Sequence, residues 1–127
     1  MLQYLLIGLG GFIGANTRYI LQQWAAGQWG ADFPYGTMII NVSGSFIIGF
    51  FLTLATERLT ISPELRLFVA TGFLGGYTTF SSFSYETLRL VELSGWGAAL
   101  LNFAGNTGLG LAAAVLGMFM ARWLQGG

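Results

Sequence analysis

Long stretches without any charged residue are the feature that most limits what this chain can fold into. Thr37–Thr56 and Leu67–Tyr85 contain no Asp, Glu, Lys or Arg. A helix that rises about 1.5 Å per residue needs roughly 20 apolar residues to cross the hydrocarbon core of a bilayer. Together with the apolar segments at both ends of the chain, the pattern predicts an all-α membrane protein whose residues 1–127 form a single domain of four transmembrane helices. The expected spans are residues 2–24, 37–56, 67–85 and 97–121.

The residues between these spans are polar or break helices. Ala25–Tyr35 is expected to form a loop that carries Pro34, and Glu57–Arg66, which contains Pro63, is expected to form the next turn. The N-terminal segment lacks a basic region and a cleavage site, so it is interpreted as a retained first helix and not as a signal peptide. Tryptophans prefer the headgroup region of a bilayer, and those near the expected span ends are Trp24, Trp29, Trp96 and Trp123.

The few charged residues exclude several kinds of site. They make up 8% of the chain, the net charge is zero, and all basic residues are arginines. There is therefore no basic face for nucleic acid, and the absence of cysteine and histidine excludes disulfides and metal sites built from those residues. Arg58, Arg66 and Arg122 lie on the expected side of both termini, against Arg89 on the other side. Because this excess is small, we expect the chain to insert in both orientations.

The third span contains the most unusual segment, TGFLGGYTTFSSFSYE, at Thr71–Glu86. Helix-weakening residues and hydroxyl groups persist in a bilayer where the protein supplies partners or lines a wet pathway. Gly75 and Gly76, followed by Thr78 and Thr79, predict an interruption of the helix, whose freed carbonyl groups would suit a cation. Close helix packing is the alternative explanation of these glycines, and it is the expected role of most others, including the Gly10–Gly14 pair.

Two phenylalanines and two serines alternate on the third span. Phe80 and Phe83 lie three residues apart, as do Ser81 and Ser84. Residues at this spacing are neighbours on a helix surface, so a row of hydroxyl groups runs beside a row of phenyl rings. The edge of a ring carries positive electrostatic potential and can face an anion, while hydroxyl groups replace part of the anion's water shell. Packing in a protein core is the alternative role of the two rings.

Asparagine amides inside the spans are further candidates for an ion site. Asn41 lies near the start of the second span, and Asn102 and Asn106 lie one helical turn apart on the fourth. Amide groups can donate hydrogen bonds to an anion in place of water. Hydrogen bonding between helices is the alternative role for each of the three residues.

Two charged residues lie inside or at the rim of the spans. Arg18 falls within the first span, where it either extends its charge toward the interface or raises the anion concentration in a vestibule. Glu86 ends the third span, and an ion pair with Arg89 is the alternative to a functional role. Because no carboxylate lies near the centre of a span, the sequence favours passive conduction over proton-coupled export.

The chain resembles the Fluc-type fluoride channels of the CrcB-like family along nearly its whole length. The resemblance is carried by GGFIGANTRY at Gly10–Tyr19, by FPYGTMIINVSGSFIIGF at Phe33–Phe50 and above all by Thr71–Glu86. It implies a homodimer of two subunits in opposite orientations that enclose two fluoride pores. It also implies a structural sodium ion at the dimer centre, held by the backbone carbonyl groups of Gly75 and Thr78.

The resemblance also implies which side chains lie along the fluoride path. Phe80 and Phe83 correspond to the pore phenylalanines, and Asn41 corresponds to the pore asparagine. Arg18 corresponds to the vestibule arginine, and the polar track corresponds to Ser81, Ser84 and Glu86. The fourth span departs from some family members, which have a tyrosine and a serine four residues apart. Asn102 and Asn106 take these places here and keep their polarity, so they are included as candidates.

The function expected from the residues and the resemblance is passive export of fluoride through a bacterial inner membrane. Such a protein is not an enzyme, and its partners are fluoride, membrane lipid and a second copy of the chain. A small dual-topology multidrug exporter has a similar length, but it would need a carboxylate deep in the first span, where this chain has none. A structural subunit without transport activity is the third possibility, and it would leave the alternating phenylalanines and serines unexplained.

Overall fold

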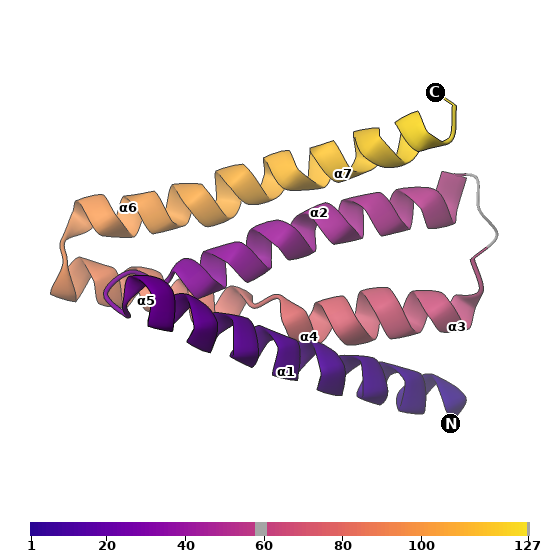
Figure 1. Cartoon of the computed structure of the whole chain (residues 1–127), viewed down its shortest axis with the longest axis horizontal. Helices are drawn as coiled ribbons and strands as arrows, with labels where there is room; N and C mark the ends of the chain where they lie inside the picture. The colour runs from indigo at the N-terminus through magenta and orange to yellow at the C-terminus, as the bar shows by residue number, and fades with distance from the viewer. Residues whose placement is uncertain (58–60, 127) are drawn as a thin grey trace.

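The computed structural model describes residues 1–57 and 61–126, so Arg58 lies outside the described residues. Every regular element in these two ranges is a helix, and the helices join into four rods (Figure 1). The first two rods are α1 (Leu2–Trp29) and α2 (Tyr35–Glu57). The third rod consists of α3 (Pro63–Arg66), the π-helical η1 (Leu67–Leu74), α4 (Gly75–Tyr77) and α5 (Phe80–Leu93). The fourth consists of α6 (Trp96–Ala104), the π-helical η2 (Gly105–Leu109) and α7 (Gly110–Leu124).

Glycines with positive φ stand at two turns between rods. Gly30 follows α1 with a φ of 82°, and Gly95 precedes α6 with a φ of 95°. Residues with a Cβ atom are strained in this region, whereas glycine is not. The expected bounds of the loop, Ala25–Tyr35, are wrong at both ends. Residues 25–29 still belong to α1, and Tyr35 is already the first residue of α2.

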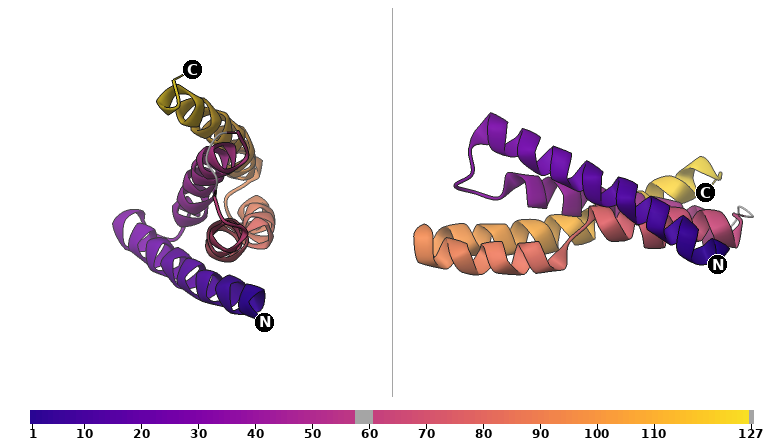
Figure 2. Two further views of the ribbon diagram at one scale, coloured as in Figure 1. Left: turned by 90° about the vertical axis from the view of Figure 1, so that its right-hand side faces the viewer. Right: turned by 90° about the horizontal axis from the view of Figure 1, so that it is seen from below.

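The rods run along the long axis of the molecule, and both termini lie at the same end (Figure 1). The second rod packs mainly against α7, and α1 packs against η1 and α4. In the view down the long axis, the rods lie along an open arc and do not form a closed bundle (Figure 2). A single chain therefore leaves part of its helix surface uncovered.

Glycines allow α1 and the third rod to approach at backbone distance. A Cβ atom on Gly76 would lie 2.7 Å from the carbonyl oxygen of Gly11, and one on Gly10 would lie 2.8 Å from the amide nitrogen of Phe73. A Cβ atom on Gly14 would also overlap the backbone of Phe73. Because helices in lipid associate largely through such close packing, these glycines stabilise the contact. The packing role expected for Gly10 and Gly14 is confirmed.

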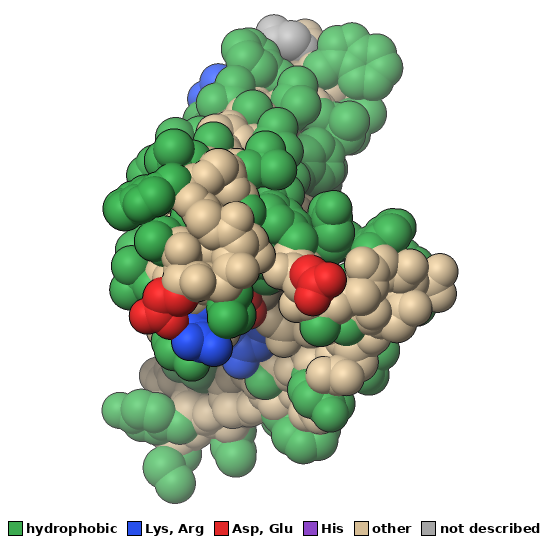
Figure 3. All heavy atoms as spheres, turned by 90° about the vertical axis from the view of Figure 1, so that its left-hand side faces the viewer, with side chains coloured by type: hydrophobic (Ala, Val, Ile, Leu, Met, Phe, Trp, Pro, Cys, Tyr) green, Lys and Arg blue, Asp and Glu red, His purple; other side chains and the backbone are tan. Residues whose placement is uncertain are grey.

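Few large side chains are buried within the chain. Ile40, Leu74 and Tyr77 form a small hydrophobic cluster between α2 and the third rod. Large exposed apolar side chains occur on all four rods, including the tryptophans near the helix ends. Seen from the end that holds the α5–α6 turn, most of the visible charged side chains lie in one zone with hydrophobic side chains above and below it, and one basic side chain lies apart near the top (Figure 3).

Among the described residues, two helices are long and apolar enough by composition to cross a membrane, α2 and the continuous helix Trp96–Leu124. The expected spans 2–24, 37–56 and 97–121 are helical throughout. The third expected span, 67–85, is helical except at its interruption. An all-helical fold with this much exposed apolar surface is the arrangement that lipid requires of a spanning protein, since helices satisfy their own backbone groups.

Candidate functional site

The third rod is interrupted at Thr78 and Thr79, between α4 and α5. Both residues are extended, Thr78 with φ −87° and ψ 158° and Thr79 with φ −151° and ψ 119°. Gly75 is helical, with φ −62° and ψ −37°. The predicted interruption is confirmed at Thr78 and Thr79, but the two glycines before them, expected to be part of it, remain helical. Gly76 serves close packing on α1, and the chain leaves the helix only after Tyr77.

The side chain of Asn41 on α2 replaces helical hydrogen bonds that are lost at the interruption. Its Oδ1 accepts a hydrogen bond from the Thr79 amide at 2.9 Å, and its Nδ2 donates to the Thr79 carbonyl at 3.1 Å. Thr79 also caps α5, because its Oγ1 accepts from the amide of Ser82 at 3.2 Å. Unpaired backbone groups are costly away from water, so these contacts stabilise the interruption. We call this pair of bonds between Asn41 and Thr79 the asparagine clamp.

The same contacts leave two carbonyl groups without their usual partners. In a continuous helix the Gly75 carbonyl would accept from the amide of Thr79, and the Thr78 carbonyl from the amide of Ser82. Instead, the Thr79 amide donates to Asn41 and the Ser82 amide donates to the Thr79 hydroxyl. Gly75 and Thr78 both line an open cleft of about 340 Å³. Carbonyl oxygens of this kind are ligands that hard cations prefer.

The two candidate phenylalanines line this cleft beside Asn41 and Asn106. The ring centroids of Phe80 and Phe83 are 5.6 Å apart, and the planes meet edge to face at 62°. Their surroundings differ, because Phe83 is 6% exposed and stacks on Phe103 at 6.2 Å, whereas Phe80 is 78% exposed. Core packing therefore accounts for Phe83 within one chain but not for Phe80.

A chain of amides connects the clamp to the fourth rod. Asn41 Nδ2 also donates to Asn106 Oδ1 at 2.9 Å, and Asn106 Nδ2 donates to Asn102 Oδ1 at 3.1 Å. Asn102 is fully buried, and its Nδ2 donates to the hydroxyl of Thr87 on α5 at 2.9 Å. The alternative role of these asparagines, hydrogen bonding between helices, is therefore present. Asn106 also faces the cleft, while Asn102 is not among the residues that line it.

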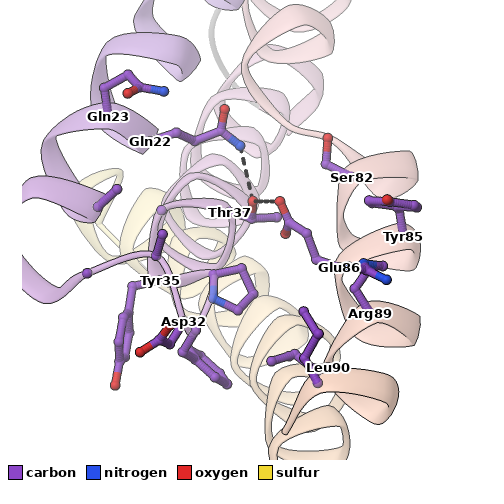
Figure 4. Close-up of a pocket in the computed structure, with 17 residues that line it drawn as sticks. Gln22, Gln23, Asp32, Tyr35, Thr37, Ser82, Tyr85, Glu86, Arg89 and Leu90 are labelled. Atoms are coloured by element: carbon purple, nitrogen blue, oxygen red, sulfur yellow. Dashed lines mark hydrogen bonds between the residues drawn. The ribbon is translucent and has the colours of Figure 1, made fainter.

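A second cavity, of about 480 Å³, is lined by residues from the end of α1, the turn that follows it, the start of α2, and α5 (Figure 4). Glu86 extends toward α2, where its Oε1 accepts from the Thr37 hydroxyl at 3.0 Å. Thr37 Oγ1 accepts in turn from Gln22 Nε2 at 3.1 Å. The other carboxylate oxygen of Glu86 is buried and has no hydrogen bond to any residue that the structure describes. In this cavity, therefore, only one of the two Glu86 carboxylate oxygens accepts a hydrogen bond from a described residue.

The two candidate serines form local hydrogen bonds. The Ser84 hydroxyl donates to the carbonyl of Phe80 at 2.9 Å, which engages its only proton. The hydroxyl groups of Ser81 and Thr79 lie 3.3 Å apart and share a hydrogen bond. The row of hydroxyls beside the two rings exists, but in this state each serine is partnered within its own chain.

Arg18 and Glu86 are not linked to each other or to the nearby arginine. Arg18 is half-buried on α1, and its guanidinium forms no hydrogen bond or ion pair with residues 1–57 or 61–126. Arg89 pairs with Glu92 at 2.6 Å, so the alternative ion pair between Glu86 and Arg89 is wrong. The reason is geometric, since Glu86 extends to Thr37 on α2 while Arg89 follows its own helix surface.

The sequence did not predict that Gln22 and Thr37 belong to the site, and it did not predict the capping role of Thr79. A threonine immediately before a helix is a common N-cap, and that signal was available for Thr79 once the interruption was placed. Gln22 and Thr37 carry no comparable signal. Their contact depends on how α1 and α2 are rotated about their axes. Because both helices carry apolar residues on all sides, the sequence pattern does not predict this rotation.

Comparison with known proteins gives a consistent match along the chain. The family model described as CrcB-like protein, Camphor Resistance (CrcB), matches residues 5–118. The "Fluoride-specific ion channel FluC" of Roseiflexus sp. (strain RS-1) is 56% identical over 118 residues, which cover 93% of this chain and 95% of that protein. Proteins of the same name from Sorangium cellulosum (strain So ce56) and Sulfurihydrogenibium sp. (strain YO3AOP1) are 48% and 49% identical. Their matches cover 95% and 98% of this chain, and 95% and 100% of those proteins.

Proposed function

The chain belongs to the CrcB-like family, and on this premise we propose that it is a fluoride-specific ion channel that releases fluoride passively from the cell. The cleft at the interruption of the third rod carries the proposal. There the edge-to-face pair Phe80 and Phe83 lies beside the amides of Asn41 and Asn106, and the described residues that line the cleft include no charged side chain. Neutral donors and ring edges can replace part of the water shell of fluoride without holding the ion so tightly that it cannot leave.

We place the fluoride path along α5, from the cavity at Glu86 to the cleft at Phe80. Glu86, Phe83 and Phe80 follow one another at intervals of three residues, which places them on one side of the helix. Arg18 lies one turn before Gln22, so its positive charge would raise the fluoride concentration near the cavity. The residues proposed to contact or steer the ion are Phe80, Phe83, Asn41, Ser81, Ser84, Arg18, Glu86, Asn102 and Asn106.

Purified protein in liposomes loaded with potassium fluoride tests this function directly. We expect rapid release of fluoride to an external fluoride electrode once an ionophore carries potassium, and no comparable release of chloride from liposomes loaded with potassium chloride. Protein-free liposomes give the background. Uptake of cations driven by a pH gradient, without fluoride release, would instead support an exporter, although α1 contains no acidic residue that could couple such transport.

We propose that the functional unit is an antiparallel homodimer of chains with four membrane spans each, in the inner membrane. Phe80 is 78% exposed and Gly75 is also exposed in the single chain, so the candidate site lies at an open surface. The open arc of rods provides an uncovered apolar face for a second copy (Figure 2). Opposite insertion fits the few and nearly balanced charges outside the spans.

A single cysteine at Ala31 should be labelled from both sides of the membrane. Ala31 is exposed in the turn between α1 and α2, and the chain has no other cysteine, so an Ala31→Cys variant carries one unique thiol. A membrane-impermeant maleimide applied to intact cells should modify a fraction of the protein, and the remainder should react only after the membrane is opened. Complete labelling, or complete protection, in intact cells would show a single orientation and contradict the antiparallel arrangement.

We propose that the carbonyl groups of Gly75 and Thr78 hold a structural sodium ion where two subunits meet. Both carbonyls lack their helical partners, both line the cleft, and oxygen ligands suit a small hard cation. In an antiparallel pair, two carbonyls from each chain would supply four oxygens. Such an ion would stabilise the dimer and would not travel with fluoride.

Removal of sodium should therefore inactivate the channel reversibly. We expect protein purified and reconstituted in N-methylglucamine salts, with potassium as the only alkali ion, to release fluoride slowly and to regain its rate when millimolar sodium is restored. Cross-linking of the dimer should fall and recover in parallel. Full activity after thorough depletion of sodium would show that the carbonyls of Gly75 and Thr78 hold no required cation and would overturn this assignment.

A further inference from the structure

Three polar side chains from three different rods form a hydrogen-bond relay at the wall of the second cavity. Gln22 Nε2 donates to Thr37 Oγ1 at 3.1 Å, and Thr37 Oγ1 donates to Glu86 Oε1 at 3.0 Å (Figure 4). The direction of the relay follows from its chemistry, because a carboxylate only accepts hydrogen bonds and a hydroxyl has one proton. Thr37 therefore accepts from Gln22 through its oxygen and donates its only proton to Glu86, and the bond from Gln22 helps to fix the orientation of the hydroxyl.

Close packing fixes Gln22 beside the start of α2. A Cβ atom on Gly36 would lie 2.7 Å from the Cα atom of Gln22, so the two backbones touch one residue before Thr37. The neighbouring Gln23 also lines the cavity, but it is exposed and has no hydrogen bond to a residue that the structure describes. Of these two adjacent glutamines, only Gln22 reaches Thr37.

The relay is the support that the structure gives to the Glu86 carboxylate. Its second oxygen has no hydrogen bond among residues 1–57 and 61–126. The nearest arginine along α5, Arg89, is engaged with Glu92 at 2.6 Å. Asp32 is the other acidic residue that lines this cavity. A carboxylate released from Thr37 would carry its negative charge into a cavity that lies on the proposed anion path, and like charge repels an anion there.

We propose that Gln22 is a positioning residue for conduction, which directs the Thr37 hydroxyl to Glu86 and so holds the carboxylate at the cavity wall. The inference rests on the proposed fluoride conduction. Gln22 itself does not contact the ion. It acts through Thr37, and its loss raises the barrier that fluoride meets at the entrance to the path.

Three single variants measure this effect in the liposome assay. Gln22→Met keeps the length of the side chain and removes the donor, and we expect it to slow fluoride release roughly three- to tenfold, as for the loss of one hydrogen bond in a coupled pair. Gln22→Glu should slow it at least as much, because it replaces the donor by a second acceptor and adds a negative charge. Gln23→Met is the matched control on the same cavity and should conduct like the parent.

A double-mutant cycle with Thr37→Val separates positioning from general destabilisation. In the Thr37→Val background, Gln22→Met should change the release rate by less than about twofold, because the relay is already broken. Equal slowing in both backgrounds would contradict the relay, and so would a Gln22→Met protein that conducts like the parent. If the parent itself releases no fluoride, the proposed function fails and not this inference, so the two failures are distinguishable.

Discussion

Replacement of Phe80 by isoleucine should reduce fluoride release at least tenfold, which corresponds to a barrier about 1.4 kcal/mol higher, while the protein stays folded. Isoleucine roughly keeps the apolar bulk but has no aromatic edge to face an anion. Phe80 is 78% exposed in the single chain, so little packing within the chain is lost. The measurement is the initial rate of fluoride release per amount of reconstituted protein, with the melting temperature in detergent measured alongside.

Phe119→Ile is the matched control for this prediction. Phe119 lies on α7, is 62% exposed and is not among the residues that line the cleft. It should conduct like the parent.

Phe83→Ile should also lose conduction, but with some loss of stability, because Phe83 is buried and stacks on Phe103. If Phe80→Ile conducts at the parental rate, the ring edge does not contact the ion and the path along α5 is wrong.

The helices could be predicted from the sequence because uncharged stretches and helix-breaking residues mark their bounds. The interruption of the third rod could be predicted only as a segment. Gly75 and Gly76 are the weakest helix formers there, yet tertiary contact with Gly11 makes Gly76 a packing residue. The actual position depends on Asn41, which pairs with the Thr79 backbone from another rod. Helix propensity depends on the local sequence alone, so it cannot predict a contact with another rod.

The candidate site shows the same limit. Spacing correctly placed Phe80 and Phe83 together, because neighbours on one helix are set by its period. Spacing did not show that one ring is buried and the other exposed, since this depends on the position of Phe103 on the fourth rod. The bond between Thr37 and Glu86 joins residues that are far apart in sequence, and no local pattern indicates it. Contacts between rods therefore had to come from the structure.

Replacement of Asn41 by aspartate should abolish fluoride release and lower the melting temperature. The amide of Asn41 donates to the Thr79 carbonyl at 3.1 Å and to Asn106 Oδ1 at 2.9 Å, and aspartate can donate to neither. Two acceptors would lose their donor, at about 1–3 kcal/mol for each group left buried and unpaired. The new negative charge would also lie beside the cleft and repel fluoride.

Asn41→Leu distinguishes the clamp from the charge, because leucine has a similar volume and removes the hydrogen bonds without adding an anion. If the asparagine clamp holds the interruption, both variants should melt at a lower temperature than the parent and release fluoride at least tenfold more slowly, a loss of about 1.4 kcal/mol. The aspartate variant should be the slower of the two. A leucine variant with parental stability and conduction, beside an inactive aspartate variant, would show that the asparagine clamp is dispensable and that only the added negative charge blocks the path. Parental conduction by both variants would remove Asn41 from the pore.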